Sequence, residues 1–248
     1  PSCGPARPRR SPCPGGREAV GHAALTIKVV NESFDIEGPS GRLEAILMNP
    51  SSDPVAGAVV CHAHPQHGGM MHFKVVFRAA KALQSARLAV LRFNFRGVGR
   101  SEGTYDGGRG EADDARAALD EVARRFPGLP LVIGGFSFGS VVGLHVGAGD
   151  ERVAAVFALG YPASFHDPTA VVDPPPSLDA GGKPRLFVQG EDDQFGSGEA
   201  LKQLVEPWPE GRSLVVVPGT GHFFDRRLDE LQGAVCTWAE EHPWEERR

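Results

Sequence analysis

The chain has 248 residues, 41% of them hydrophobic, and a formal net charge of −5, which fits one globular domain with a large core. Its isoelectric point near 6.0 gives no basic footprint, so nucleic acid is not an expected partner. No apolar run reaches the roughly 18 residues that a membrane-spanning helix requires, so no membrane span is expected.

Residues 1–22 are rich in proline and arginine and lack the apolar segment of a secretory signal, so we expect a disordered tail ahead of a single domain at 23–248. The chain's four cysteines do not have the spacing of a disulfide framework. They are Cys3, Cys13, Cys61 and Cys236. We therefore expect a reducing, cytoplasmic setting.

Alternating apolar and polar side chains open the ordered part of the chain. Residues 25–29, 32–36 and 43–48 alternate around Gly38-Pro39-Ser40-Gly41, which predicts an antiparallel hairpin. Residues 58–61 are then a short, fully apolar run, typical of a strand buried on both faces.

From this point, strand-like runs alternate with segments of helical periodicity. Helices are predicted at 73–87, 111–126, from Ser137 to about 147, at 198–205 and at 223–241. Strands are predicted at 88–95, 131–133, 153–159, 185–189 and 213–217. The alternation predicts a mostly parallel, twisted sheet of about eight strands with helices on both faces. Prolines and paired glycines leave 163–184 as loop, so we expect little or no lid.

The segment Gly135-Phe136-Ser137-Phe138-Gly139 places a serine where a predicted strand ends and a predicted helix begins. So sharp a turn strains the backbone of the serine, and the flanking glycines leave room for neighbouring chain. The hydroxyl of Ser137 would face substrate, and the Phe138 amide would be placed for a developing oxyanion. The pentapeptide alone is equally typical of a Gly/Ser turn. A catalytic role for Ser137 therefore depends on whether a base and an acid lie near it.

A serine hydroxyl needs a base within hydrogen-bond reach and a third group to orient that base. The predicted strand at 186–189 ends in Gly190-Glu191-Asp192-Asp193, and the strand at 214–217 is followed by His222. The carboxyl ends of parallel strands open onto one edge of a sheet, so Ser137, one of these acids and His222 can converge.

With these residues in the order serine, acid, histidine, the chain resembles the α/β-hydrolase superfamily over roughly residues 25–238. The resemblance implies the α/β-hydrolase fold. The family's Gly-x-x-Asp pattern implies Asp193 as the acid, beside Ser137 as nucleophile and His222 as base.

The loop Cys61-His62-Ala63-His64-Pro65-Gln66-His67-Gly68-Gly69 and residues 92–103 resemble compact bacterial serine hydrolases related to dienelactone hydrolase. Their loop reads His-Pro-His-Pro and then Gly-Gly; here Ala63 replaces the first proline, and the nucleophile is serine where dienelactone hydrolase has cysteine. In the family this loop supplies the second oxyanion amide. Because Pro65 has no N–H, Gln66 is the expected donor beside Phe138.

The resemblance implies an esterase that cleaves small-molecule carboxylic esters through an acyl-enzyme on Ser137. The absence of a predicted lid in 163–184 favours short or solvent-exposed acyl groups. No cofactor is expected. An amidase or peptidase with the same three residues, or a non-catalytic α/β-hydrolase domain used for binding, remain alternatives, and the choice between monomer and homodimer stays open.

Two other patterns have plainer interpretations. The loop histidines His62, His64 and His67 lack a neighbouring carboxylate, so we expect them to shape the loop and expect no metal site. Arg96 and Arg100, in a glycine-rich segment without dinucleotide-binding spacing, are expected to be solvated or paired with carboxylates.

Overall fold

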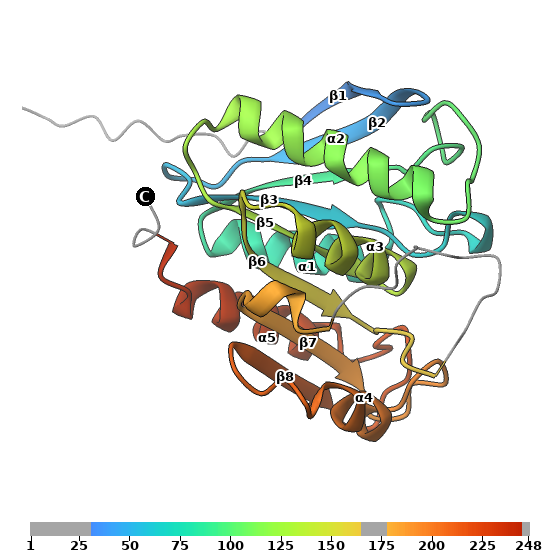
Figure 1. Cartoon of the computed structure of the whole chain (residues 1–248), viewed down its shortest axis with the longest axis vertical. Coiled ribbons are helices and arrows are strands. Elements are labelled where there is room, and N and C mark those ends of the chain that lie inside the picture. Colours follow the sequence, from blue (N-terminus) through green and yellow to red (C-terminus); the bar gives the residue numbers. More distant parts are fainter. Residues whose placement is uncertain (1–30, 165–177, 245–248) are drawn as a thin grey trace, which may run out of the picture.

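The computed structural model describes residues 31–164 and 178–244, and its strands form an eight-stranded sheet (Figure 1). The strands are β1 (Asn31–Gly38), β2 (Gly41–Met48), β3 (Ala56–Cys61), β4 (Leu88–Phe93), β5 (Leu131–Phe136), β6 (Val153–Leu159), β7 (Arg185–Gly190) and β8 (Arg212–Val217). The helices are α1 (Lys74–Ser85), α2 (Arg109–Arg125), α3 (Phe138–Gly149), α4 (Gly198–Val205) and α5 (Leu228–Glu241), with short 3₁₀ turns η1 (Pro65–His67) and η2 (Ala180–Gly182).

The strand order is β1-β2-β4-β3-β5-β6-β7-β8. β1 pairs antiparallel with β2, and β2 antiparallel with β4. Every pair from β4 to β8 is parallel. The predicted α/β-hydrolase fold, a mostly parallel sheet with an antiparallel N-terminal hairpin, is confirmed. The loops that follow β3, β5, β7 and β8 therefore open at the same edge of the sheet.

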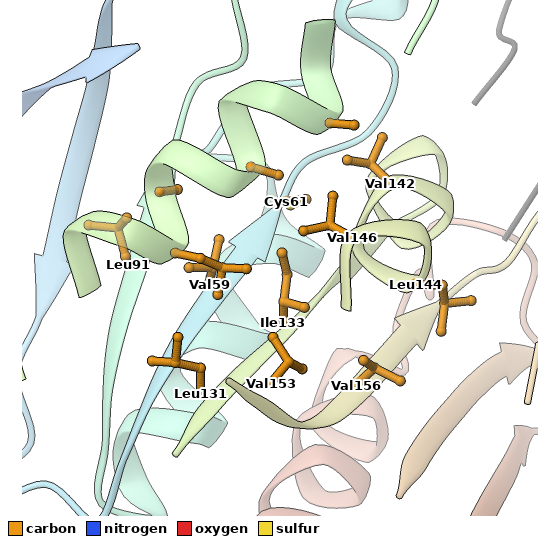
Figure 2. Close-up of a cluster of buried hydrophobic side chains, with 14 of the residues drawn as sticks. Val59, Cys61, Leu91, Leu131, Ile133, Val142, Leu144, Val146, Val153 and Val156 are labelled. Carbon is orange, nitrogen blue, oxygen red and sulfur yellow. The ribbon is translucent and has the colours of Figure 1, made fainter. Parts of the chain in front are cut away.

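Helices cover both faces of the sheet, with α2 and α3 on one side and α1 and α5 on the other (Figure 1). Successive residues of β3 alternate between the two cores: Val59 belongs to the core that includes α2 and α3, and Val60 to the core that includes α1 and α5. Figure 2 shows the first of these cores, where Val59 and Ile133 of the sheet lie beneath Val142 and Val146 of α3. Burial on both faces explains why the central strands are nearly continuous apolar runs.

Some element ends differ from the sequence-based expectation. β4 ends at Phe93, two residues before the predicted end, and β5 continues to Phe136. The prediction that the last helix starts at residue 223 was wrong, because α5 begins at Leu228. Phe224 and Arg226 adopt positive φ values of 52° and 61°, which no helix accommodates. Residues 223–227 instead form turns that connect the site to α5.

Several expectations fall on parts of the chain outside the described residues. These are the tail at 1–22, the strand at 25–29 and most of the loop at 163–184. In the segments that the structure does describe, we find no helix with the length and apolar character to cross a bilayer.

Candidate active site

Ser137 occupies the one-residue turn between β5 and α3, with φ 55° and ψ −121°. A positive φ is costly for a residue with a side chain, so the surroundings must impose it. A Cβ on Gly135 would lie 2.4 Å from the Cys61 carbonyl oxygen, and one on Gly139 would lie 2.4 Å from that of His62. The two glycines thus allow the end of β3 to contact the turn closely. Ser137 is half-buried and lies at the carboxyl edge of the sheet.

His222, in the loop after β8, links Ser137 to Asp193, in the loop after β7. Its Nε2 lies 2.9 Å from Ser137 Oγ, and its Nδ1 lies 2.8 Å from Asp193 Oδ2. A carboxylate only accepts hydrogen bonds, so Nδ1 carries the ring proton and Nε2 is free to accept from the serine hydroxyl. His222 and Asp193 are each 3% exposed, which shields the pair from water. The structure therefore brings together the three side chains selected from the sequence.

The carboxylate of Asp193 has further donors besides the imidazole. Its Oδ1 accepts from the Phe195 amide at 2.8 Å, and its Oδ2 accepts from Gln189 Nε2 at 2.9 Å. Gln189 lies in β7 and is fully buried. Sequence reasoning missed this residue, although a glutamine in an otherwise apolar strand that leads to the acid loop was a usable signal.

Aromatic rings fix the imidazole of His222. The ring centroids of Phe136, Phe195 and Phe223 lie 4.8, 4.6 and 5.2 Å from that of His222. Gly160, after β6, leaves room on another side, since a Cβ there would lie 3.3 Å from ring atoms of His222. Packing as well as hydrogen bonding thus sets the orientation of the base.

The two amides predicted to stabilise an oxyanion have different surroundings. Phe138 is the first residue of α3, and an amide at that position has no acceptor within its own helix. The Gln66 amide lies in η1 and donates to Nδ1 of His64 at 3.2 Å, which caps that turn. The Phe138 amide thus has no acceptor within its helix, whereas the Gln66 amide already has one.

The histidines after β3 shape the loop, as expected. The Nε2 of His62 accepts from the Phe95 amide at 3.0 Å, so its Nδ1 carries the proton and donates to the Ala63 carbonyl at 2.6 Å. Burial lowers the pKa of His62 to about 4, which keeps the ring neutral. His64 stacks on His67 with centroids 4.4 Å apart. Within residues 31–164 and 178–244, no three His, Cys, Asp or Glu side chains are grouped as metal ligands.

Arg96 and Arg100 are paired with carboxylates, as predicted. Arg96 forms a buried bidentate pair with Asp114 of α2, with contacts of 3.0 and 2.7 Å. Arg100 contacts Glu44 at 3.1 Å on the surface. These pairs attach the segment after β4 to α2 and β2.

Comparison with known proteins gives a family and similar solved structures. Residues 56–236 match the family model described as an alpha/beta hydrolase domain. An alpha-beta serine hydrolase homologue from Coxiella burnetii is 38% identical, with a TM-score of 0.74 over 83% of this chain and 96% of that one. An α/β serine hydrolase without lid from Xanthomonas campestris is 34% identical, with a TM-score of 0.74 over 84% of this chain and 93% of that one.

Dienelactone hydrolase from Anabaena variabilis is 19% identical, with a TM-score of 0.68 over 84% of this chain and 96% of that one, and this likeness concerns the fold alone. The family match, the closer serine hydrolases and the strand-turn-helix around Ser137 all agree with the resemblance found in the sequence. The chain belongs to the alpha/beta hydrolase family and is a hydrolase of the α/β serine type.

Proposed function

We propose that the protein hydrolyses carboxylic esters through an acyl-enzyme formed on Ser137. The observation that carries the proposal is the continuous hydrogen-bond chain from Ser137 through His222 to Asp193, with contacts of 2.9 and 2.8 Å. His222 Nε2 takes the hydroxyl proton as Ser137 Oγ attacks the acyl carbon, and then returns it to the leaving alcohol. Asp193 holds the ring tautomer and stabilises the imidazolium. A water molecule, activated by the same base, then releases the acid.

Electrostatic stabilisation of the tetrahedral oxyanion is the second part of the proposal. The Phe138 amide, at the start of α3, supplies one hydrogen bond. The Gln66 amide is the proposed second donor, and to act as one it must leave or share its bond to His64. One such donor contributes about 3 kcal/mol to transition-state stabilisation in comparable sites.

The proposed substrates are small esters with short or solvent-exposed acyl groups. Apolar side chains at the rim of the site suit the uncharged parts of such molecules: Phe223, next to His222, is 44% exposed, and its ring lies 5.9 Å from that of Phe73. The similar α/β serine hydrolase from Xanthomonas campestris is without a lid, and a site of that kind would give little enclosure for a long chain. Turnover that peaks with long-chain fatty esters would contradict this part of the proposal.

A fluorophosphonate probe tests the nucleophile directly, because it forms a covalent bond with an activated serine. We expect stoichiometric labelling of the wild-type protein and none of Ser137→Ala. Ser85→Ala, which changes an exposed serine at the far end of α1, is the matched control and should label like the wild type.

Failure of the intact, folded protein to label would instead support a non-catalytic binding domain. A panel of esters and amides that share one acyl group then separates an esterase from an amidase or peptidase, and faster cleavage of the amides would overturn the ester assignment.

A further inference from the structure

We propose that Gln189 is a positioning residue that fixes the Asp193 carboxylate beneath His222 and limits how strongly that carboxylate stabilises the imidazolium; the inference rests on the proposed function of this site. Gln189 lies in β7, four residues before the acid, and its side chain is fully buried. It touches no reacting atom and would act only through Asp193.

The amide group of Gln189 connects two loops at the carboxyl edge of the sheet, the one after β6 and the one after β7. Its Nε2 donates to Asp193 Oδ2 at 2.9 Å and to the Gly196 carbonyl at 2.6 Å, and lies 3.1 Å from the Tyr161 carbonyl. Its Oε1 accepts from the Tyr161 amide at 2.8 Å. These contacts fix which way the amide points, because a flipped group would aim its oxygen at a carboxylate and two carbonyls.

Gln189 and His222 share one oxygen of the acid. Oδ2 of Asp193 receives both the Gln189 amide and the His222 Nδ1 proton, whereas Oδ1 receives the Phe195 amide. A second donor on Oδ2 fixes the direction from which the imidazole bonds. It also disperses the negative charge without adding a cation, so the carboxylate attracts a proton on the imidazole less strongly.

Other charged groups near the pair act at greater distance. In the parts of the chain that are described, no Lys or Arg side chain is hydrogen-bonded to Asp193. The negative charge of Asp193 is therefore stabilised by hydrogen bonds from neutral amides and from His222. Glu191 and Asp192 on the same loop, and Asp225 after β8, are exposed to solvent, which screens them. Burial raises the pKa of Tyr161 to about 12, so that phenol stays neutral.

Two substitutions separate positioning from packing. Gln189→Glu keeps the size of the side chain and an acceptor for the Tyr161 amide, but replaces the donor to Asp193 with a second carboxylate. Gln189→Met removes the donor without adding charge. The matched controls are Gln84→Glu and Gln84→Met, because Gln84 of α1 is also a buried glutamine, 6% exposed, and its amide donates to the Asn49 carbonyl at 2.7 Å, away from the site.

The primary measurement is the titration of the His222 ring nitrogens by ¹⁵N NMR, which does not require activity. We expect its midpoint to move to higher pH by more than about 0.5 unit in Gln189→Met, because the imidazolium faces a less compensated negative charge. The shift should be smaller in Gln189→Glu, because two buried carboxyl groups in contact share a proton that again bonds to Asp193. The Gln84 variants should titrate like the wild type. Ester hydrolysis by the Gln189 variants should lose about 10- to 100-fold in kcat, with KM within about twofold.

An unchanged His222 midpoint in both folded Gln189 variants would overturn the inference, even if activity fell, because loss of packing alone leaves the titration in place. Equal shifts in the Gln84 variants would overturn it as well. A shifted midpoint in a protein whose wild type neither cleaves esters nor reacts with the fluorophosphonate would refute the proposed function while supporting the role of Gln189.

Discussion

At the scale of single residues, the close approach of β3 to the turn at Ser137 explains why glycines flank that serine. A Cβ on Gly139 would meet backbone oxygens of Cys61 and His62 at 2.5 and 2.4 Å, so backbone must move to admit it. Gly149, at the other end of the same helix, has no atom within 4 Å of such a Cβ.

We therefore expect Gly139→Ala to lower the free energy of unfolding by more than about 2 kcal/mol and to abolish fluorophosphonate labelling. Gly149→Ala should change stability by less than about 1 kcal/mol, in the stabilising direction, and should leave labelling intact. Urea titrations and probe labelling of both variants check this. Equal stability of the two variants would mean that the turn tolerates a side chain.

Residue-level reasoning could predict Ser137 and His222 because each follows a predicted strand in a recognisable short pattern, whereas Asp193 was chosen among three neighbouring acids by the family resemblance. It could not predict how the loops bond to one another. The bond from the Gln66 amide to His64 is a local cap of η1 that needs the side-chain geometry to be seen, and the contact of Gln189 with Asp193 depends on how the loop after β7 folds back on the strand.

At the scale of elements, the segment between β4 and α2 is held by buried polar contacts. Asp114 of α2 accepts from the Arg96 amide at 2.9 Å as well as from its guanidinium. Glu111 in the first turn of α2 accepts from the Gly108 amide at 2.8 Å and caps the helix. These acids explain why a glycine-rich segment follows a defined path past the site.

Adjacent acids on α2 provide a matched comparison. Asp114→Ala would leave the buried Arg96 without its carboxylate, so we expect a loss of about 3–5 kcal/mol in the free energy of unfolding. Asp113 pairs with Arg116 on the exposed face of the helix, so Asp113→Ala should cost less than about 1 kcal/mol. Chemical denaturation of the two variants measures the difference. Similar losses would show that the buried pair adds nothing beyond a surface pair.

Helices and strands were predictable where the periodicity of apolar residues was strong. The prediction was wrong where apolar residues belong to a loop instead. β6 and α4 occupy the predicted residues, since one is a continuous apolar run and the other has a Ser197 cap at its start. The apolar residues Phe223 and Phe224 prolonged the helical pattern of α5, but Phe223 packs on His222 and Phe224 has positive φ. The contacts of Phe223 and Phe224 with the surrounding loop thus outweigh the helical pattern of these two residues.

At the scale of the whole molecule, the mostly parallel sheet was predictable because the parallel strands are buried on both faces and are apolar runs in the sequence. The order of the strands was not predictable, because nothing in the sequence states that β4 inserts between β2 and β3. That insertion also brings the Phe95 amide, just after β4, to His62, just after β3. A buried neutral histidine therefore joins two strand ends near the site, and its protonation bears on the stability of the whole fold.

The pKa of His62 is lowered to about 4 in the folded protein by burial, whereas an unfolded histidine titrates near 6.5. Between these values the unfolded chain binds a proton that the folded one does not, so stability is complete above about pH 6.5 and falls as the pH decreases towards 4. The contribution of His62 to this decrease is roughly 3 kcal/mol.

The stability gap between the wild type and His62→Gln should therefore narrow by roughly 3 kcal/mol from pH 7 to pH 4, because glutamine does not titrate. His72→Gln, at an exposed position of the segment before α1, should differ from the wild type by less than about 0.5 kcal/mol throughout. Urea unfolding across this pH range measures both gaps. Parallel curves for the wild type and His62→Gln would mean that His62 does not resist protonation in the folded protein.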